Sequence, residues 1–536
     1  MSVFNALIIS ILDTIEINLQ RYLQILKKES DGILKNRFLK ITAILLVFLM
    51  LMSLCISCKK TEEEEEGEET TVSTVEGETY RDDLPRDLNY KGADVNFVSR
   101  AHDWYKNEVT VESDNTDDIV NEAVYNREKD VEKRLGINII NTMLDDGGKT
   151  GEEAYARVTE QVKMDVTTGT GLYDIAINNM YHTMGVASEG FLYNLYDVPN
   201  IDLTKSYYSQ NYNFKGTING KLYTTTGDAS LTFIKFAFVT FFNKEIANAN
   251  KIPDLYQTVL DGNWTIGYQK ELIAGLYDDI GTETDVKDEG DAYGLVMNPV
   301  TAIDPYWSSF DLSIISMDVE GKLFLDCDTA KASTVYNLIY DLVYINPDVY
   351  CAPHQSDDGE FATQAKMFAN NQALFTTLRM ASCEDANMRN MEAEYGIIPM
   401  PKWETGQDQY YSYCHDLFSV YGISAGVTAD RLEMVGAAFE CFFSESDQCR
   451  YNQFEVALKV KYQSDTSAGQ MLDLVVDNVK IDTGWIYSKS VNKIGLIMRE
   501  LITAKLSGVF KSKWDGNTIK YNNAIDALEA EFGIVD

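Results

Sequence analysis

The sequence predicts an α/β fold in which parallel strands alternate with helices. Three short apolar segments with strand-like composition, 95–98, 137–141 and 174–177, are separated by two segments with helical spacing, 117–135 and 152–166. Strands joined through a helix pair in parallel, because the helix returns the chain to the starting edge of the sheet. Hydrophobic residues make up 45% of the chain and charged residues 24%, which is typical of globular bodies with large cores. A length of 536 residues predicts about two or three domains.

The first predicted helix, 117–135, is indicated by its periodicity and by its ends. Its apolar residues recur on one helical face: Val120, Val124, Val131 and Leu135. Asp117 is expected to accept hydrogen bonds from the first turn, and Gly136 to adopt the left-handed conformation that ends a helix. The second predicted helix, 152–166, places Tyr155, Val158, Val162 and Val166 on one face in the same way.

Later segments continue the α/β pattern. Residues 231–242 form a long apolar and aromatic run, and Thr265 is expected to cap a helix that follows Trp264. A short strand is predicted at the start of 395–401, because the prolines in this segment prevent a longer ladder. Amphipathic helices are predicted at 430–443 and 521–532.

The N-terminal region predicts export and a lipid anchor. A basic cluster ending at Lys40 precedes an apolar run, 41–55, and then Ser57 and Cys58. This order is typical of an export signal, and Cys58 after Ser57 resembles the lipobox of bacterial lipoproteins, in which the cysteine is acylated. We therefore predict a leader at 1–58. Residues 59–88 begin with an acidic tract that lacks the apolar residues of a core, and are predicted to be a disordered tether.

Charge and cysteine content restrict the partners. The formal net charge is −37, so the surface repels nucleic acid phosphates and anionic membranes, and no nucleic acid partner is expected. Six cysteines follow the leader: Cys327, Cys351, Cys383, Cys414, Cys441 and Cys449. An even number in an exported protein permits disulfides, and buried free thiols are the alternative. No CxxC pair occurs among these six, so a thiolate metal site has no support.

Two motifs suggest other chemistry, but each lacks residues that this chemistry requires. Residues 422–426 match the GxSxG nucleophile pattern, but that arrangement requires a histidine after the serine, and all four histidines precede Ser424. The acidic stretch 278–291 lacks the alternating aspartate order of a calcium loop and predicts a solvated loop. Carboxylates are abundant, but nothing selects a glycosidase pair from them.

Several short segments together resemble the extracellular solute-binding lipoproteins of ABC importers, in the group related to maltose-binding protein. The resemblance covers residues 88–536 and rests on the order of these segments: 118–125, 173–176, 220–223, 241–244, 263–265, 304–307, 395–401 and 471–474. It implies a two-lobed, type II periplasmic-binding-protein-like fold with a hinge. Each lobe would contain a mixed, mostly parallel sheet flanked by helices.

The resemblance also implies where the chain passes between lobes. The first crossing is expected near 228–231, the return near 387–394 and the last near 444–451. Lobe 1 would then comprise 89–228 plus 388–445, and lobe 2 would comprise 229–387 plus 446–536.

A sugar presents hydroxyls and a face of C–H groups, which carboxylates, amides, arginine and aromatic rings match. In open α/β sheets ligands bind beyond the carboxyl ends of the strands. Candidate ligand-binding residues chosen from strand-end loops, hinge segments and the resemblance are Asp103, Trp104, Asn178, Asn179, Tyr181, Asp228, Tyr306, Trp307, Arg379, Tyr411 and Trp485. The resemblance gives Tyr306 and Trp307 the role of an aromatic platform; the alternative is that they are core aromatics.

These observations predict a monomeric protein, anchored through Cys58 on the outer face of a bacterial cell membrane. It would capture a mono- or oligosaccharide by hinge closure and deliver it to ABC permease subunits, with no catalytic residues, cofactor or metal. The alternatives left open are a peptide or another small solute, a surface glycoside-processing enzyme, and a sensor subunit that feeds a membrane kinase.

Overall fold

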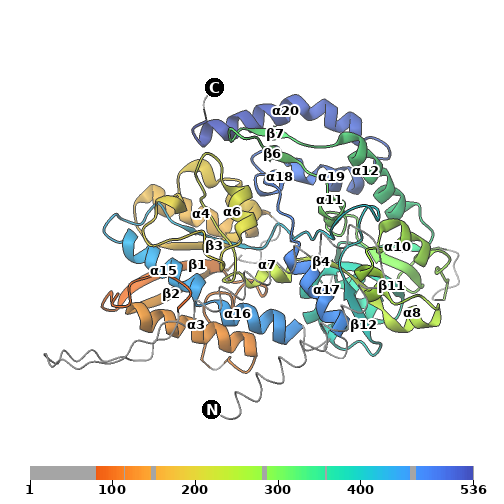
Figure 1. Cartoon of the computed structure of the whole chain (residues 1–536), viewed down its shortest axis with the longest axis horizontal. Helices are drawn as coiled ribbons and strands as arrows, with labels where there is room; N and C mark the ends of the chain where they lie inside the picture. Colours follow the sequence, from red (N-terminus) through yellow and green to blue (C-terminus); the bar gives the residue numbers. More distant parts are fainter. Residues whose placement is uncertain are drawn as a thin grey trace, which may run out of the picture. The chain divides into compact units, whose positions relative to one another are not determined.

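The computed structural model describes residues 80–113, 115–145, 152–280, 286–356, 359–458 and 466–534. The predicted leader, Cys58 and most of the predicted tether lie outside these residues. Within the chain, Thr79–Asp536 forms one compact unit. This unit contains two main β-sheets with helices around them, drawn on the two sides of Figure 1 with α7 between them.

The first sheet has four strands in the order β13-β3-β1-β2. The strands β1 (Ala93–Arg100), β2 (Ile137–Leu144) and β3 (Ile175–Asn179) are parallel, and β13 (Ser419–Ile423) pairs with β3 in the antiparallel direction. Two helices make the parallel crossovers: α3 (Ile119–Leu135) and α4 (Glu152–Thr168). The predicted alternation of strands and helices in this region is confirmed.

Capping explains where α3 begins and ends. The side chain of Asp118 accepts hydrogen bonds from the backbone N–H groups of Val120 at 2.8 Å and Asn121 at 3.1 Å. The cap is therefore Asp118 rather than the predicted Asp117. At the other end Gly136 has φ 62°, as predicted, and a side chain there would collide with Asn89.

The second sheet has five strands in the order β12-β4-β11-β5-β8. The outer strand β12 (Tyr395–Ile398) and β11 (Ala373–Arg379) both run antiparallel to β4 (Phe238–Asn243), whereas β5 (Tyr293–Met297) and β8 (Val349–Cys351) run parallel to β11. This sheet is mixed, as the resemblance implied.

The apolar run 231–242 divides into a short helix, α7 (Leu231–Lys235), and β4. Helix α10 (Ile266–Ile273) begins at the predicted cap, because Thr265 accepts a hydrogen bond from the Tyr268 backbone at 3.2 Å. Further helices around the second sheet are α8 (Lys244–Ala249), α9 (Leu255–Leu260), α11 (Pro305–Ser309), α12 (Thr329–Tyr344) and α13 (Ala362–Ala369).

Two antiparallel segments connect the sheets. Thr225 bridges Tyr421 near the first sheet, and Ala237 bridges Cys414 next to β4. The return to the first sheet was expected near 387–394, whereas β12 pairs with β4 and keeps residues up to Ile398 in the second sheet. The chain therefore returns after β12, and a strand pairing of this kind cannot be deduced from local composition.

The C-terminal helices pack on both sheets. Helix α15 (Leu432–Ser444) and α16 (Asp447–Tyr451) pack against α3, and α17 (Thr466–Asp477) packs against β12 and α9. Helix α20 (Phe510–Glu531) lies along α12 and starts before the predicted Tyr521, because Phe510 and Trp514 extend its buried face.

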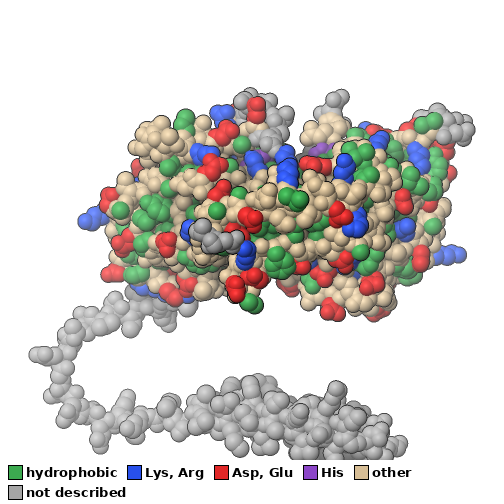
Figure 2. Space-filling view, turned by 90° about the horizontal axis from the view of Figure 1, so that it is seen from above, with side chains coloured by type: hydrophobic (Ala, Val, Ile, Leu, Met, Phe, Trp, Pro, Cys, Tyr) green, Lys and Arg blue, Asp and Glu red, His purple; other side chains and the backbone are tan. Residues whose placement is uncertain are grey.

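The structure also shows the state of the cysteines and the distribution of charged side chains on the surface. The six cysteines of the described part are free, four of them buried and two half-buried. Across the ranges that the structure describes, no helix combines the length and the apolar character needed to span a bilayer. Acidic side chains are scattered over the face drawn in Figure 2, with lysines and arginines among them.

Candidate ligand-binding site

The carboxyl ends of parallel strands from both sheets, together with the connection between the sheets, position the candidate site. In the first sheet β1 ends at Arg100 and β3 at Asn179, and in the second sheet β11 ends at Arg379. The returning connection passes between them, since the His415 backbone donates to the Phe236 carbonyl at 2.9 Å. We refer to each sheet with its surrounding helices as one half of the fold, the first half containing the first sheet. Side chains from both halves therefore meet where α/β proteins bind ligands.

Arg379 is the centre of the contacts between the halves. Its side chain is buried, with Nη1 at 3.2 Å from His415 Nδ1. The guanidinium carbon lies 5.1 Å from the Trp104 ring centroid and 4.6 Å from those of Phe236 and Phe361. An arginine over several aromatic faces is held by cation–π attraction. Arg379 of the second sheet thus contacts Trp104 from the loop after β1.

Tyr181 and His182 form the wall next to β3. They belong to α5 (Met180–Met184), which begins directly after β3. The Tyr181 backbone donates to the Asp416 carbonyl at 3.0 Å, and its ring centroid lies 5.1 Å from that of His182. His182 Nδ1 is 2.7 Å from Asn179 Oδ1, which also accepts a hydrogen bond from the His182 backbone at 3.0 Å. The proton of a neutral His182 therefore lies on Nδ1, and Nε2 is an acceptor.

The charge state of His182 is set by its surroundings. Burial and, to a smaller extent, the positive charges of Lys489, Arg100 and Lys493 together lower the pKa of His182 to about 3. The imidazole is therefore neutral at physiological pH, with the Nε2 lone pair available for a hydrogen bond.

An aromatic pair and a charged group complete the region. The rings of Tyr413 and Trp485 are 4.8 Å apart, and burial raises the pKa of Tyr413. Arg499 Nε donates to Asp304 Oδ1 at 3.1 Å, and Arg499 Nη2 lies 4.0 Å from Asp416 Oδ2. Burial raises the pKa of Asp304 to about 6, while Arg499 opposes this shift.

Four predicted residues, Trp104, Tyr181, Arg379 and Trp485, come together in this region. Asn178 and Asn179 are next to it, but they are buried and internally bonded. Both donate to the Tyr155 carbonyl, at 3.0 and 3.1 Å, and hold the start of α4 against β3. Their amides position the wall, and in this structure they are not exposed to a ligand.

Other predicted residues have partners elsewhere. The Asp103 carboxylate is 86% exposed and pairs with Lys106 at 2.7 Å. Asp228 lies between Arg81 at 2.8 Å and Arg450 at 3.4 Å, where burial raises its pKa.

The remaining predicted residues also lie among other side chains. The Tyr411 ring centroid lies 5.2 Å from Lys480 Nζ. Tyr306 and Trp307 are buried, and Trp307 stacks on Trp514 with ring centroids 6.3 Å apart. In this structure these two rings are core aromatics rather than an open platform, because α20 covers Trp307 and Tyr306 packs on Phe310, with ring centroids 5.4 Å apart.

Sequence reasoning missed several residues of the region. Arg100 is still in β1, so a search of the loop after the strand passed over it. Tyr155 is part of the apolar face of α4, and its ring lies 4.8 Å from the Arg100 guanidinium carbon. Lys489 follows α18 (Thr483–Ile486) and has no local motif, although its Nζ is 5.9 Å from the Tyr181 ring centroid. Strand-end position could have indicated Arg100, but nothing local indicates Lys489.

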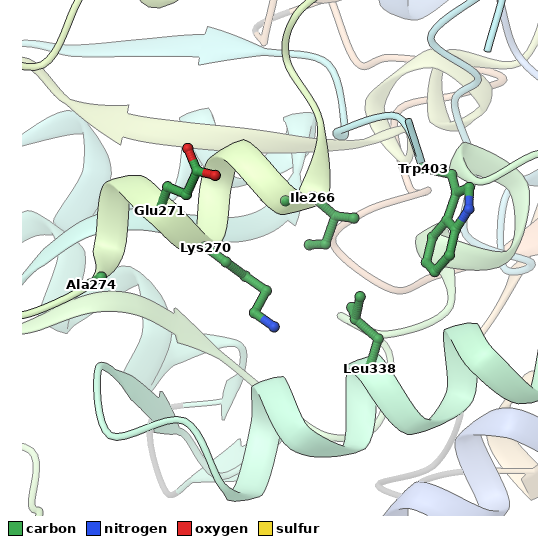
Figure 3. Close-up of a pocket in the computed structure, with 7 residues that line it drawn as sticks. Ile266, Lys270, Glu271, Ala274, Leu338 and Trp403 are labelled. Carbon is green, nitrogen blue, oxygen red and sulfur yellow. The ribbon is translucent and has the colours of Figure 1, made fainter. Parts of the chain in front are cut away.

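A separate pocket of about 510 Å³ belongs to the second half of the fold (Figure 3). Ile266, Leu338 and Trp403 border it, Lys270 extends toward it and Glu271 points away. Its lining residues are Ile266, Gly267, Lys270, Glu271, Ala274, Leu338 and Trp403. None of the predicted site residues lines it, and no strand of the first sheet contributes to it.

One group of possible metal ligands occurs among the described residues: Asp82, Cys441 and Glu445. Arg134 occupies its centre, with Nη1 at 2.6 Å from Asp82 Oδ2 and 2.9 Å from Glu445 Oε1. A guanidinium in this position supplies the positive charge that a metal ion would supply. This group therefore acts as an ion-pair network.

Comparison with known proteins identifies the fold. The structure matches the GacH receptor of Streptomyces glaucescens, which was solved unliganded and in complex with acarbose. The match has a TM-score of 0.50 and 15% sequence identity, and covers 83% of this chain and all of the receptor. The chain has the fold of this receptor. This confirms the predicted periplasmic-binding-protein-like fold with its two mixed sheets.

Two further solute-binding-protein structures have TM-scores of 0.49. They are the maltose/maltodextrin-binding domain MalE from Bdellovibrio bacteriovorus bound to maltotriose, at 13% identity over 81% of this chain, and the ABC substrate-binding protein Lmo0181 from Listeria monocytogenes with cycloalternan, at 12% identity over 83%. Each is covered completely. No protein-family model and no curated protein matches the sequence.

Proposed function

We propose that this chain is the solute-binding component of an ABC importer, and that it binds a sugar between its two sheets. The observation that carries the proposal is the contact of Arg379 from the second sheet with Trp104 from the first, at 5.1 Å. Aromatic faces and charged hydrogen-bond donors from both halves of the fold converge on one region. This combination matches the C–H face and the hydroxyls of a sugar. The GacH receptor, which has the same fold, is known in complex with acarbose.

The proposed mechanism is closure of the halves about the two connecting segments. Trp104, Tyr181 and Arg100 belong to the first half, and Arg379 and Phe361 to the second. A ligand that contacts both groups binds the closed arrangement more tightly than the open one, and so shifts the population toward closure. Closure, with no covalent step, would present the loaded protein to the permease.

The proposed location is the outer face of the cell membrane, with Cys58 as the lipid attachment point. The support is the order of basic cluster, apolar run and cysteine in the sequence. Replacing Cys58 with serine should release the protein from the membrane fraction, and metabolic labelling with a fatty acid should no longer mark it. Retention and labelling of the Cys58→Ser variant would contradict the anchor.

A thermal-shift screen tests the sugar assignment. The full chain, purified in mild detergent, is screened against sugars of varied charge and length and against short peptides. A ligand that binds only the folded state stabilises it by about 2.7 kcal/mol at a concentration of one hundred times Kd, so a true ligand raises Tm. We expect a sugar to do so. A shift with peptides and with no sugar would overturn the sugar assignment.

Two variants separate the site from the scaffold. Arg379→Met removes the charge that contacts both halves and should abolish the shift. Arg389→Met makes the same change at an exposed position of the second half, on α14 (Ala386–Arg389), and should leave the shift intact. Equal shifts in both variants would exclude the region around Arg379 as the binding site.

A further inference from the structure

The wall of the site on the first sheet carries positive charge that has no paired carboxylate among the described residues. The chain as a whole has a formal net charge of −37, so unpaired cations in a buried region are unexpected. Burying an unpaired charge is unfavourable, and native proteins retain such groups mainly where a ligand or ion completes them. Arg100 and Lys489 are the two cations in question.

Arg100 is 5% exposed at the carboxyl end of β1. Its guanidinium carbon lies 4.2 Å from the Tyr105 ring centroid and 4.8 Å from that of Tyr155. The rings fix the position of the guanidinium and leave hydrogen-bonding capacity unused. Nη1 has no hydrogen-bond partner, and no carboxylate within the described ranges pairs with this arginine.

Lys489 lies next to Tyr181, with Nζ at 5.9 Å from its ring centroid. Its stem crosses Gly185 so closely that a Cβ on that glycine would lie 2.5 Å from Lys489 Cδ. This packing directs the half-buried side chain along α5. No ion pair of Lys489 occurs in the part of the chain for which side chains are described.

The nearby acids already have partners. Asp304 and Asp416 both face Arg499, and Asp103 pairs with Lys106 on the outside. These acids therefore pair with other cations, whereas no acid of the described ranges pairs with Arg100 or Lys489. A neutral sugar would leave both cations uncompensated in the closed protein.

The same wall also carries groups suited to a sugar ring. His182 is 3% exposed, and its buried Nε2 has no partner among the described residues. As Nδ1 carries the proton, Nε2 can accept a hydrogen bond from a hydroxyl. Tyr155 and Tyr181 both lie beside His182 and provide aromatic faces, with ring centroids 5.6 and 5.1 Å from that of His182.

We propose that the ligand is a sugar carrying an anionic group, a uronate in the first instance, whose carboxylate binds Arg100 and Lys489 while a hydroxyl donates to His182 Nε2. This inference rests on the proposed function, because it names the class of sugar that the same site takes. A sugar phosphate would present the same charge to the same two cations, so the experiment includes both sources of anion.

Isothermal titration calorimetry on the full chain in detergent tests the proposal. The probes are oligosaccharides of galacturonate and of glucuronate, their neutral methyl esters, glucose 1-phosphate and maltotriose. A charge-assisted hydrogen bond contributes about 1.5–3 kcal/mol, which corresponds to about a tenfold to hundredfold change in Kd. We expect a uronate to bind at least about tenfold more tightly than its own methyl ester. Tighter binding of glucose 1-phosphate than of any uronate would show that the site prefers a phosphate to a carboxylate, and would overturn the uronate assignment.

Matched variants identify the cations responsible. Lys489→Gln should weaken uronate binding about tenfold or more and change ester binding little. Arg100→Lys should retain part of the affinity that Arg100→Gln loses. Lys511→Gln, an equivalent change on the exposed side of α20, is the control. If Arg100→Gln fails to fold, Lys489→Gln still decides the question.

The outcomes separate this inference from the proposed function. If maltotriose or the methyl esters bind and the acids do not bind more tightly, the anionic-sugar inference fails while the sugar-binding function stands. Loss of affinity for esters and acids alike in Lys489→Gln would also overturn it. If no sugar of any kind binds, both the inference and the proposed function fail.

Discussion

At the scale of single residues, Glu440 is a buried carboxylate whose protonation should be visible in the stability of the protein. It lies on α15 and accepts hydrogen bonds from the hydroxyls of Tyr207 and Tyr208, the latter at 2.6 Å, and from the Asp202 backbone at 3.2 Å. Burial raises the pKa of Glu440 to about 6, from an ordinary value of 4.5. The hydrogen bonds oppose this shift and do not cancel it.

The sign of the pH dependence follows from that shift. A carboxyl group with a raised pKa in the folded state binds protons more tightly there than in the unfolded chain. Its stabilising contribution is complete below pH 4.5 and is lost as the pH rises through about 6. The loss is about 2 kcal/mol. The wild-type protein should therefore lose stability between pH 4 and 7 relative to Glu440→Gln, measured by urea denaturation. Parallel pH profiles of the two proteins would contradict the assignment.

Residue type and chain position led to part of the candidate site. Trp104, Tyr181, Arg379 and Trp485 are among the residues selected from the sequence, and the fold brings them together. The choice failed where tertiary packing decides exposure. Helix α20 covers Trp307, and Asp228 lies between Arg81 and Arg450. Lys489 could not be predicted, since its place beside Tyr181 depends on contacts between distant segments.

At the scale of elements, two helical glycines have opposite surroundings. Gly436 is in the middle of α15, where an added Cβ would lie 2.0 Å from the Pro199 carbonyl oxygen. A backbone oxygen cannot move aside as a flexible side chain can, so only glycine allows this close approach. Gly469 is in α17, and an added Cβ there would meet no atom within 4 Å.

The two glycine-to-alanine variants should therefore change stability in opposite directions. Gly436→Ala should destabilise the protein by about 2 kcal/mol or more, because it separates α15 from the preceding segment or strains the helix. Gly469→Ala should stabilise it by up to about 1 kcal/mol through helix propensity. Chemical denaturation of both variants beside the wild type measures the difference. Equal effects would show that α15 does not approach Pro199 so closely.

Helices and strands were predictable where the sequence signal lies within one segment, but the strands with which they pair were not. Apolar spacing and caps located α3, α4 and the start of α10, because these signals lie within a few residues of one another. The run 231–242 was seen as one apolar segment, since nothing in its composition separates α7 from β4. The sheet to which β12 belongs depends on pairing with β4, a strand far away in the sequence.

At the scale of the whole molecule, α20 connects regions that the two sheets build separately. Near its start, Phe510 packs on Tyr336 of α12, with ring centroids 5.7 Å apart. Near its end, Phe532 packs on Tyr223, with ring centroids 5.4 Å apart, and the Phe532 carbonyl accepts a hydrogen bond from Asn219 at 3.0 Å. One helix thus contacts the second half at one end and the first half at the other (Figure 1). An opening of the halves that moves α20 away from the first half must break the contacts of Phe532.

Phe532→Ala tests this connection. Phe532 is fully buried, so its truncation should destabilise the protein by about 3–5 kcal/mol, the usual range for a buried phenylalanine. Because the contact joins the halves, the variant should also unfold in two separate steps in calorimetry where the wild type unfolds in one. Ile519→Ala, at a position of α20 that is 76% exposed, should change neither the stability nor the number of steps. A single transition with unchanged stability in Phe532→Ala would show that the end of α20 does not hold the two halves together, and that the connecting segments alone couple them.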